Sequence, residues 1–195
     1  MNKKSVENIN SVFRKGLCMG CGTCEGVCPS DAIRMVKDNS VGCYFPKINE
    51  NKCINCGLCL KVCPGKSVDF DLLNHNVFGK APEDILIGNY NGFYIGYATN
   101  DNLRYNSSSG GVVTALLLFA LKSGIINGAL VTKMNKENPL EPHSFIARTR
   151  EEIISAIGSK YCPVPANVAL KEVLNAKGKF AVVGLPCHIQ GIRKA

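Results

Sequence analysis

The sequence lacks any apolar stretch long enough for a secretory signal or a membrane-spanning helix. The first sixteen residues, MNKKSVENINSVFRKG, contain no apolar core of signal-peptide length. The longest apolar run, VVTALLLFAL at 112–121, is far shorter than a membrane span. The composition, 46% hydrophobic and 19% charged, is that of a globular chain rather than a disordered one. We therefore expect a cytoplasmic protein with no membrane span.

Clusters of basic residues are also missing, although the formal net charge of the 195 residues is +8. Lys and Arg are scattered along the chain, and this pattern gives no indication of nucleic-acid binding. The Walker A loop and the G-x-G-x-x-G pattern are absent too, so neither common nucleotide motif is present.

Cysteine, in contrast, is abundant, with eleven residues. A reducing cytosol keeps thiols free, so clustered cysteines there more often bind metal or react than form disulfides. Two segments, CMGCGTCEGVCPSDAI from Cys18 and CINCGLCLKVCPGKSV from Cys53, repeat the pattern C-x2-C-x2-C-x3-C-P at a shift of 35 residues. This spacing is typical of two-cluster ferredoxins, in which the fourth cysteine of each run ligates the other cluster.

The repeat therefore predicts two 4Fe–4S clusters with crossed ligation. The first set of ligands is Cys18, Cys21, Cys24 and Cys63, and the second set is Cys53, Cys56, Cys59 and Cys28. Gly22 and Gly57 stand where the loops need unusual backbone angles. Zinc is the alternative metal, but zinc sites usually combine two separated C-x2-4-C pairs and have no use for the third, closely spaced cysteine.

The predicted clusters change the charge balance and the fold expectation. At roughly −2 per ligated cluster, the loaded protein would carry about +4, which fits docking to an acidic redox partner. Between the runs, IRMVKDNSVGCYFPKINENK predicts two short strands around an Asp-Asn-Ser turn, as in a small α+β ferredoxin-like unit of residues 1–80. Cys43 lies on this hairpin outside the pattern and is expected to be a free, partly buried thiol.

Residues 81–195 have the alternating pattern of an α/β layered domain. Predicted strands lie at 92–99 (GFYIGYAT) and 126–134 (INGALVTKM) and in SFIARTR and KFAVVGL, and predicted helices lie in GVVTALLLFALKSG and ANVALKEVLNAKG. NSSSGGVVTALL at 106–117 places hydroxyls and two glycines before an apolar helix, which suits an anion site. A plain Ser N-cap with a glycine turn explains that segment equally well.

Three segments of this region resemble one known family. DNLRYNSSSGGVVTALLLFALKSGIINGALV, IGSKYCPVPANVALKEVL and FAVVGLPCHIQGIRK are similar, in order and separation, to the N-terminal part of the family of coenzyme F420 hydrogenase/dehydrogenase β subunits. Several members of that family carry a two-cluster ferredoxin module ahead of this part. The resemblance implies a flavoprotein in which FAD exchanges a hydride with F420 or another organic substrate and passes single electrons to iron–sulfur clusters.

The resemblance also implies which residues would lie near FAD. They are Ser107, Ser108, Ser109, Gly110, Gly111, Lys133, Lys160 and Tyr161. Without the family, a solvated loop charge is the expected role of each of the two lysines, Tyr161 would fit a core position equally well, and Cys162 is expected to be a small buried residue.

Cys187, in GLPCHIQGIRKA, is similar to a family cysteine that helps ligate a further cluster. A new helix begins there, whose dipole should lower the thiol pKa. Relatives usually have Gln where this chain has His188, which could donate a hydrogen bond to a cofactor or titrate near neutrality. Family members continue well beyond this segment, so the resemblance predicts a truncated chain with an incomplete α/β flavin domain.

Two other functions stay open at this level. A ferredoxin-type electron carrier would use residues 81–195 only to dock a redox partner. A regulatory or scaffold protein with structural zinc would bind no iron and show no absorption near 400 nm, because zinc is spectroscopically silent.

Overall fold

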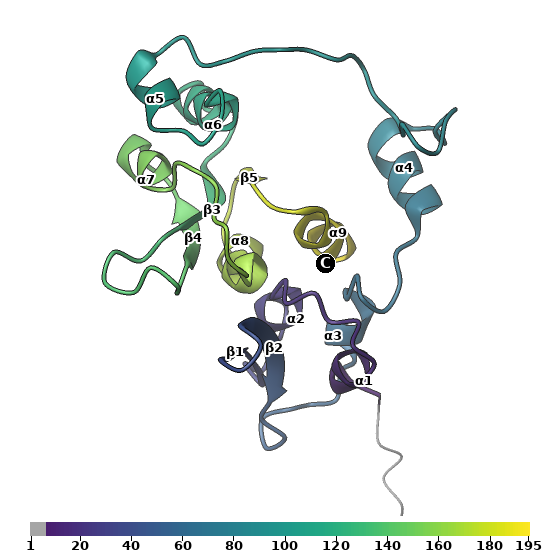
Figure 1. Cartoon of the computed structure of the whole chain (residues 1–195). Helices are drawn as coiled ribbons and strands as arrows, with labels where there is room; N and C mark the ends of the chain where they lie inside the picture. Colours follow the sequence, from purple (N-terminus) through teal and green to yellow (C-terminus); the bar gives the residue numbers. More distant parts are fainter. Residues whose placement is uncertain (1–6) are drawn as a thin grey trace, which may run out of the picture.

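The computed structural model describes residues 7–195 and shows a mixed α/β chain in two parts, with the cysteine runs in the first (Figure 1). The first part contains three short helices and one hairpin: α1 (Asn10–Arg14), α2 (Thr23–Gly26), β1 (Ile33–Asp38), β2 (Cys43–Ile48) and α3 (Leu58–Lys61). The strands pair antiparallel, with Ile33 opposite Ile48 and Asp38 opposite Cys43. The predicted hairpin around the Asp-Asn-Ser turn is therefore confirmed.

The core of the first part is made of aliphatic residues and cysteines together. Ile9, Val12, Ile33 and Leu60 are buried beside three of the cysteines of the two runs. Because sulfur atoms take up part of this interior, the module has few other buried side chains to hold its loops in place.

The second part forms a small mixed sheet between helices. Its elements are α5 (Asp101–Tyr105), α6 (Val112–Lys122), β3 (Gly128–Lys133), β4 (His143–Ala147), α7 (Arg150–Ser155), the 3-10 helix η1 (Ala166–Ala169), α8 (Leu170–Asn175), β5 (Phe180–Val182) and α9 (Pro186–Lys194). The strand order is β4-β3-β5, in which β3 pairs antiparallel with β4 and parallel with β5. The predicted α/β layered domain is thus present, and its sheet is mixed.

Alternating residues of β3 supply the two faces of this sheet. Ala129 and Val131 pack with Leu117 and Leu121 of α6 and with Ile153 of α7. On the other face, Leu130 packs with Ile146, Ala166 and Phe180. Because side chains of a strand alternate between faces, one short strand anchors helices on both sides.

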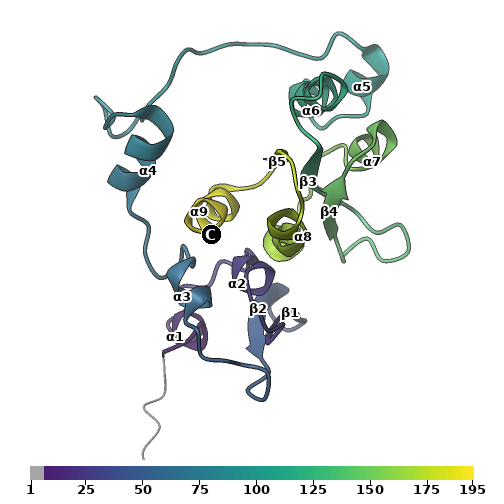
Figure 2. The ribbon, with the colours of Figure 1, turned by 180° about the vertical axis from the view of Figure 1, so that it is seen from behind.

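The predicted strand at 92–99 is wrong. This segment has no strand in the structure, and Tyr94 and Ile95 are fully exposed or nearly so. It belongs to a long connection from α4 (Phe70–Phe78) to α5, which Figure 2 shows arching away from both parts. A strand needs a neighbouring strand for its N–H and C=O groups, and residues 92–99 pair with none of the strands β1 to β5.

The two parts meet where α2 packs against η1 and α9. The buried Asn167 donates from Nδ2 to Thr23 Oγ1 at 2.8 Å and to the His188 carbonyl at 2.9 Å. Its backbone N–H donates to the Cys21 carbonyl at 3.0 Å. A Cβ at Gly26 would collide with the Asn167 carbonyl, and a Cβ at Gly191 would collide with Thr23 Oγ1. At Gly26 the obstacle is another backbone, so only glycine allows this approach.

None of the helices in residues 7–195 is both long enough and apolar enough to cross a membrane.

We predict that Gly26→Ala destabilises the protein by about 1–3 kcal/mol, because the new methyl group must push α2 away from the Asn167 backbone. Thermal unfolding of the anaerobic protein checks this, with an expected fall of roughly 2–4 °C per kcal/mol. Gly96→Ala is the matched control, since a Cβ there meets open space. Equal unfolding temperatures for the two variants would contradict the close contact.

Candidate functional site

The eight cysteines of the two runs surround two cavities in the first part. One cavity is lined by Cys18, Cys21, Cys24 and Cys63. The other is lined by Cys28, Cys53, Cys56 and Cys59. Each cavity thus receives three cysteines from one run and the fourth cysteine of the other run. In residues 7–195, no three His, Cys, Asp or Glu side chains are grouped around a point that suits a single metal ion.

The loops that carry these cysteines have the same backbone conformation in both runs. Gly22 and Gly57 are the N-caps of α2 and α3, with φ of 83° and 73°. Gly20 and Asn55, related by the 35-residue shift, are also left-handed, with φ of 65° and 56°. Sequence reasoning missed this second pair. Asn at the position of a repeat glycine was the available signal, because Asn tolerates the left-handed region better than most residues.

Burial dominates the electrostatics of the sulfur atoms. It raises the pKa of the Cys24 thiol well above its ordinary value and raises the pKa values of Cys18, Cys59 and Cys63. At Cys28, burial acts in the same direction, but hydrogen bonds from Ala32 and Ser30 outweigh it and lower the pKa. The Ala32 N–H donates to Cys28 Sγ at 3.3 Å. Metal binding must therefore displace protons from most of these thiols.

The remaining lining of both cavities is largely apolar. Ile9 and Met35 line the first cavity, and Ile33, Ile48 and Leu58 line the second. Four thiol donors within an apolar wall are the chemical surroundings that iron–sulfur clusters require, because thiolates bind iron and the wall limits access of water. The residues present therefore fit a cubane cluster in each cavity.

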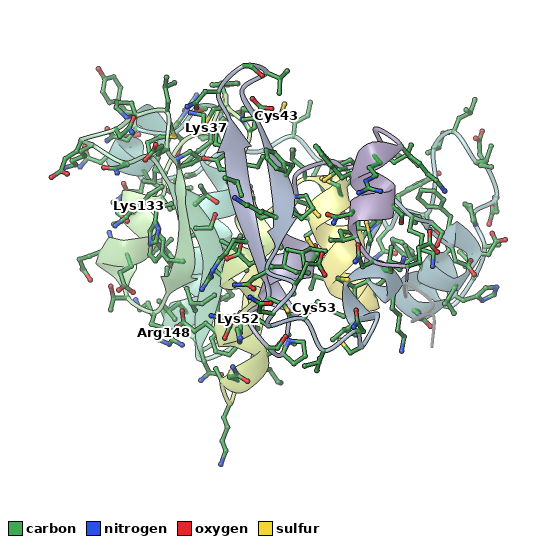
Figure 3. The ribbon with its side chains drawn as sticks, turned by 90° about the horizontal axis from the view of Figure 1, so that it is seen from below. Lys37, Cys43, Lys52, Cys53, Lys133 and Arg148 are labelled. Carbon is green, nitrogen blue, oxygen red and sulfur yellow. The ribbon has the colours of Figure 1, made fainter. Side chains whose placement is uncertain are left out.

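Three cysteines line neither cavity, and their surroundings differ from expectation. Cys43 is exposed at the end of the hairpin (Figure 3), and the expectation of partial burial is wrong. Cys162 is only half-buried. Cys187 lies in the first turn of α9, where burial raises its thiol pKa and the nearby Cys21 thiolate raises it further. The expected lowering by the helix dipole is overturned, because desolvation is the larger effect.

The Ser-Gly-Gly segment and the loop around Lys160 lie together in the second part. The Ser159 N–H donates to Ser108 Oγ at 2.7 Å. Gly111, with φ of 74°, is the N-cap of α6, and no side chain caps that helix. Ser107 Oγ instead donates to the Leu103 carbonyl at 2.7 Å. The plain Ser N-cap is therefore not what the structure shows, and the first N–H groups of α6 keep no side-chain partner among the described residues.

Lys160 and Tyr161, the two candidate residues of this loop, differ in their burial. Lys160 Nζ donates to the carbonyls of Ala156, Ile157 and Gly158 at 2.6–3.1 Å, and burial lowers its pKa. It is thus not the solvated loop charge that the residue pattern alone suggested. Tyr161 is 90% exposed, which excludes a core role.

Lys133 ends β3, with Nζ 5.0 Å from the centre of the Phe145 ring. Figure 3 shows Lys133 and Arg148 on the second-part side of the molecule, whereas Lys52 and Cys53 lie on the ferredoxin-like part. Among residues 7–195, Lys133 makes no hydrogen bond or ion pair with the Ser-Gly-Gly segment, so its role near a cofactor stays a prediction.

His188 is buried and fully engaged with backbone groups. Its Nδ1 accepts from the Leu185 N–H at 3.0 Å, so Nε2 carries the proton that is donated to the Val164 carbonyl at 3.1 Å. Burial lowers the pKa of His188, and the hydrogen bond to Val164 only partly opposes this. The residue therefore stays neutral at physiological pH and holds the start of α9, rather than titrating or pointing a donor at a cofactor.

Comparison with known proteins assigns both parts of the chain. Residues 93–171 match the family model for coenzyme F420 hydrogenase/dehydrogenase, beta subunit N-term, and residues 17–67 match the 4Fe-4S dicluster domain. The coenzyme F420 hydrogenase subunit beta of Methanothermobacter thermautotrophicus is 35% identical over 113 residues, which are 57% of this chain and 40% of that protein.

Two longer matches extend over both parts. The coenzyme F420-dependent sulfite reductase of Methanocaldococcus jannaschii is 30% identical over 95% of this chain and 26% of its own length. A component of the F(420)H(2) dehydrogenase of Methanosarcina mazei is 27% identical over 95% of this chain and 50% of its own length. Among solved structures, a chain of the F420-reducing hydrogenase complex from Methanosarcina barkeri is similar to a shorter region. Its TM-score is 0.46 and its sequence identity is 32%, over 53% of this chain and 37% of that one.

This chain therefore spans a quarter to a half of the length of the curated relatives described above. The two family models match the parts of the chain in which the cysteine repeat and the three family-like segments lie. The chain combines a 4Fe-4S dicluster domain with an N-terminal domain of the family of coenzyme F420 hydrogenase/dehydrogenase beta subunits.

Proposed function

We propose that this chain is the iron–sulfur and flavin-binding part of a cytoplasmic oxidoreductase that passes electrons between an organic two-electron substrate and a one-electron redox partner protein. The observation that carries the proposal is that the loop of the first cysteine cavity packs directly on the second part, through Asn167. A metal-bearing loop and a family domain for hydride chemistry are thereby held as one unit, with a boundary proposed near residue 80.

The dicluster part would hold one 4Fe–4S cluster in each cavity, with crossed ligation. Cys63 would complete the set of the first run, and Cys28 would complete the set of the second run. This assignment is supported by the lining of the two cavities. Such clusters exchange one electron at a time. The chain's own contribution is to exclude water through the apolar lining and to donate the Ala32 N–H to the Cys28 sulfur.

The second part would bind FAD, which exchanges both single electrons and hydride. Ser108, Ser109 and Gly110 precede the uncapped first turn of α6, where backbone N–H groups favour a negatively charged group such as a phosphate. The Ser108–Ser159 hydrogen bond fixes this segment against the loop of Lys160 and Tyr161. Lys133, at the end of β3, would complete the surroundings. Coenzyme F420 is the proposed organic substrate, from the names of the relatives.

A third cluster beside Cys187 belongs to the same proposal. The Cys187 sulfur lies close enough to Cys21 for the Cys21 charge to raise its pKa. A cluster there would need further thiolate ligands, which the family resemblance places in a C-terminal region.

A second candidate function is a ferredoxin-type carrier whose second part only docks a redox partner. The arrangement of Lys160 favours it, because three carbonyls hold the ammonium group that the flavin proposal would use. The oxidoreductase function requires bound flavin and the carrier function does not, so bound flavin would exclude the carrier function.

We predict that paired cysteine variants distinguish crossed from uncrossed ligation. With crossed ligation, Cys21→Ala with Cys63→Ala damages one cluster and keeps about four of roughly eight irons, whereas Cys56→Ala with Cys63→Ala damages both. Iron and sulfide analysis of anaerobically reconstituted protein, with EPR of the reduced samples, measures this. Uncrossed ligation reverses the two outcomes, and Cys43→Ala is the control that should keep all the iron.

We also predict that the anaerobic protein binds FAD and that Ser109→Glu weakens the binding about tenfold, because a carboxylate before α6 repels the cofactor phosphates. FAD fluorescence quenching measures the dissociation constant. Ser123→Glu, at the C-cap end of the same helix, is the matched control and should leave the affinity unchanged. Equal weakening of FAD binding by Ser109→Glu and Ser123→Glu would contradict this placement of the cofactor phosphates.

A further inference from the structure

Two lysines of the second part bind the backbone of the two fourth cysteines. Lys171 of α8 donates from Nζ to the Cys28 carbonyl at 3.2 Å. Lys194 of α9 donates from Nζ to the Cys63 carbonyl at 3.0 Å. Cys28 and Cys63 are equivalent under the 35-residue repeat. Each run therefore accepts a hydrogen bond from a lysine of the second part at the same position. Both lysines are half-buried, which limits screening by water.

The two ammonium groups differ in their other partners. Lys171 also forms an ion pair with Asp31, with Nζ 2.5 Å from Oδ1. The Lys171 ammonium lowers the pKa of Asp31, so this carboxyl group is ionised at neutral pH. Lys194 donates its second hydrogen bond to the Ser67 carbonyl at 2.8 Å. Within residues 7–195, Lys194 takes part in no ion pair. Among the described residues, the Lys171 ammonium is therefore paired directly with a carboxylate and the Lys194 ammonium is not.

We propose that Lys171 and Lys194 are positioning residues that raise the reduction potentials of the two clusters, each acting on one cluster through the carbonyl of its fourth cysteine. Lys194 acts on the cluster held by Cys18, Cys21, Cys24 and Cys63, and Lys171 acts on the other. The reason is electrostatic: one-electron reduction adds one negative charge to a cluster, and a fixed positive charge beside a ligand stabilises the reduced form. The proposal rests on the proposed crossed ligation.

Because only Lys171 is paired with a carboxylate in the described part of the chain, we expect the two lysines to shift the reduction potentials of their clusters by unequal amounts. Since Asp31 offsets part of the Lys171 charge, loss of Lys171 removes less positive potential than loss of Lys194. Asp31 itself acts in the opposite direction, because its negative charge opposes reduction of the neighbouring cluster. A purely structural role of these side chains gives no reason for effects of opposite sign.

The test is a redox titration of the full chain with both clusters loaded, followed by EPR. Lys194→Gln should lower one of the two midpoints, with about a threefold to tenfold smaller equilibrium constant for reduction, where tenfold corresponds to 59 mV for one electron. Lys171→Gln should lower the other midpoint by less. Lys194→Arg and Lys171→Arg keep the charge and should titrate close to the unmodified protein.

Asp31→Asn supplies the variant of opposite sign, and it should raise the midpoint that Lys171→Gln lowers. Asn suits this position because Asp31 has a φ of 52°, which Asn adopts readily. Lys179→Gln, an exposed lysine of the same part, is the control for the loss of any one charge. Midpoints that shift equally in all the glutamine variants, or that do not shift, overturn the proposal.

Iron content and unfolding temperature are measured for each variant before the titration. If a glutamine variant fails to keep its clusters, Asp31→Asn still decides the sign of the effect, because it removes a negative charge beside the cluster that Lys171 faces. Failure of the proposed function gives a different result, since it appears as missing iron or missing flavin in the unmodified protein. The titration needs neither flavin nor an organic substrate.

Discussion

The contact between α2 and the 3-10 helix η1 is the interaction on which the arrangement of the two parts depends. Gly26 brings α2 against the Asn167 backbone, and Asn167 holds Thr23 and the Cys21 carbonyl. The same Asn167 side chain binds the carbonyl of His188, whose ring is fixed by Leu185 and Val164. One buried amide thus ties a cysteine loop, η1 and the start of α9 together, although its Oδ1 has no hydrogen-bond partner among the described residues.

This contact also explains why the two halves of the cysteine repeat differ in sequence. Gly26 corresponds to Lys61 under the 35-residue shift, and Lys61 is exposed while Gly26 is buried. A Cβ at Gly22 would lie 2.9 Å from the Pro165 carbonyl, whereas a Cβ at Gly57 meets open space. The first run is therefore adapted to the second part, and the second run keeps an exposed cysteine, Cys56, at the surface. Electrons that pass between the two proposed clusters would thus travel from the face covered by the second part to the exposed side of the second run.

Local patterns in the sequence predicted much of the fold. The cysteine spacing, the hairpin and the strands around 128–133 and 143–147 depend on contacts that are short in sequence or on strict periodicity. The strand predicted for residues 92–99 is absent although large apolar residues and glycines give this segment a strand-like pattern. Strand formation also depends on a neighbouring strand edge, which no local pattern reveals. The predicted lowering of the Cys187 pKa failed for a similar reason, since burial is a tertiary property.

The most informative part of the site was beyond sequence reasoning. The hydrogen bonds from Asn167 to Thr23, from Lys171 to Cys28 and from Lys194 to Cys63 join residues that are 131 to 144 positions apart. Each of the three donor side chains has the local sequence pattern of an ordinary helix residue. Glycine at position 26 of an otherwise matching repeat was a usable signal of close packing, although it does not name the partner. Single-sequence patterns identify ligands more readily than the contacts that position them.

In the proposed arrangement, two 4Fe–4S clusters with crossed ligation occupy the two four-cysteine cavities of one small module. Quantitative EPR of the fully reduced, anaerobically reconstituted chain tests it most directly. Crossed ligation holds the two clusters near one another, so we expect about two spins per chain in a spectrum split by their magnetic interaction. A single spin per chain, or two spins without any interaction, would contradict it.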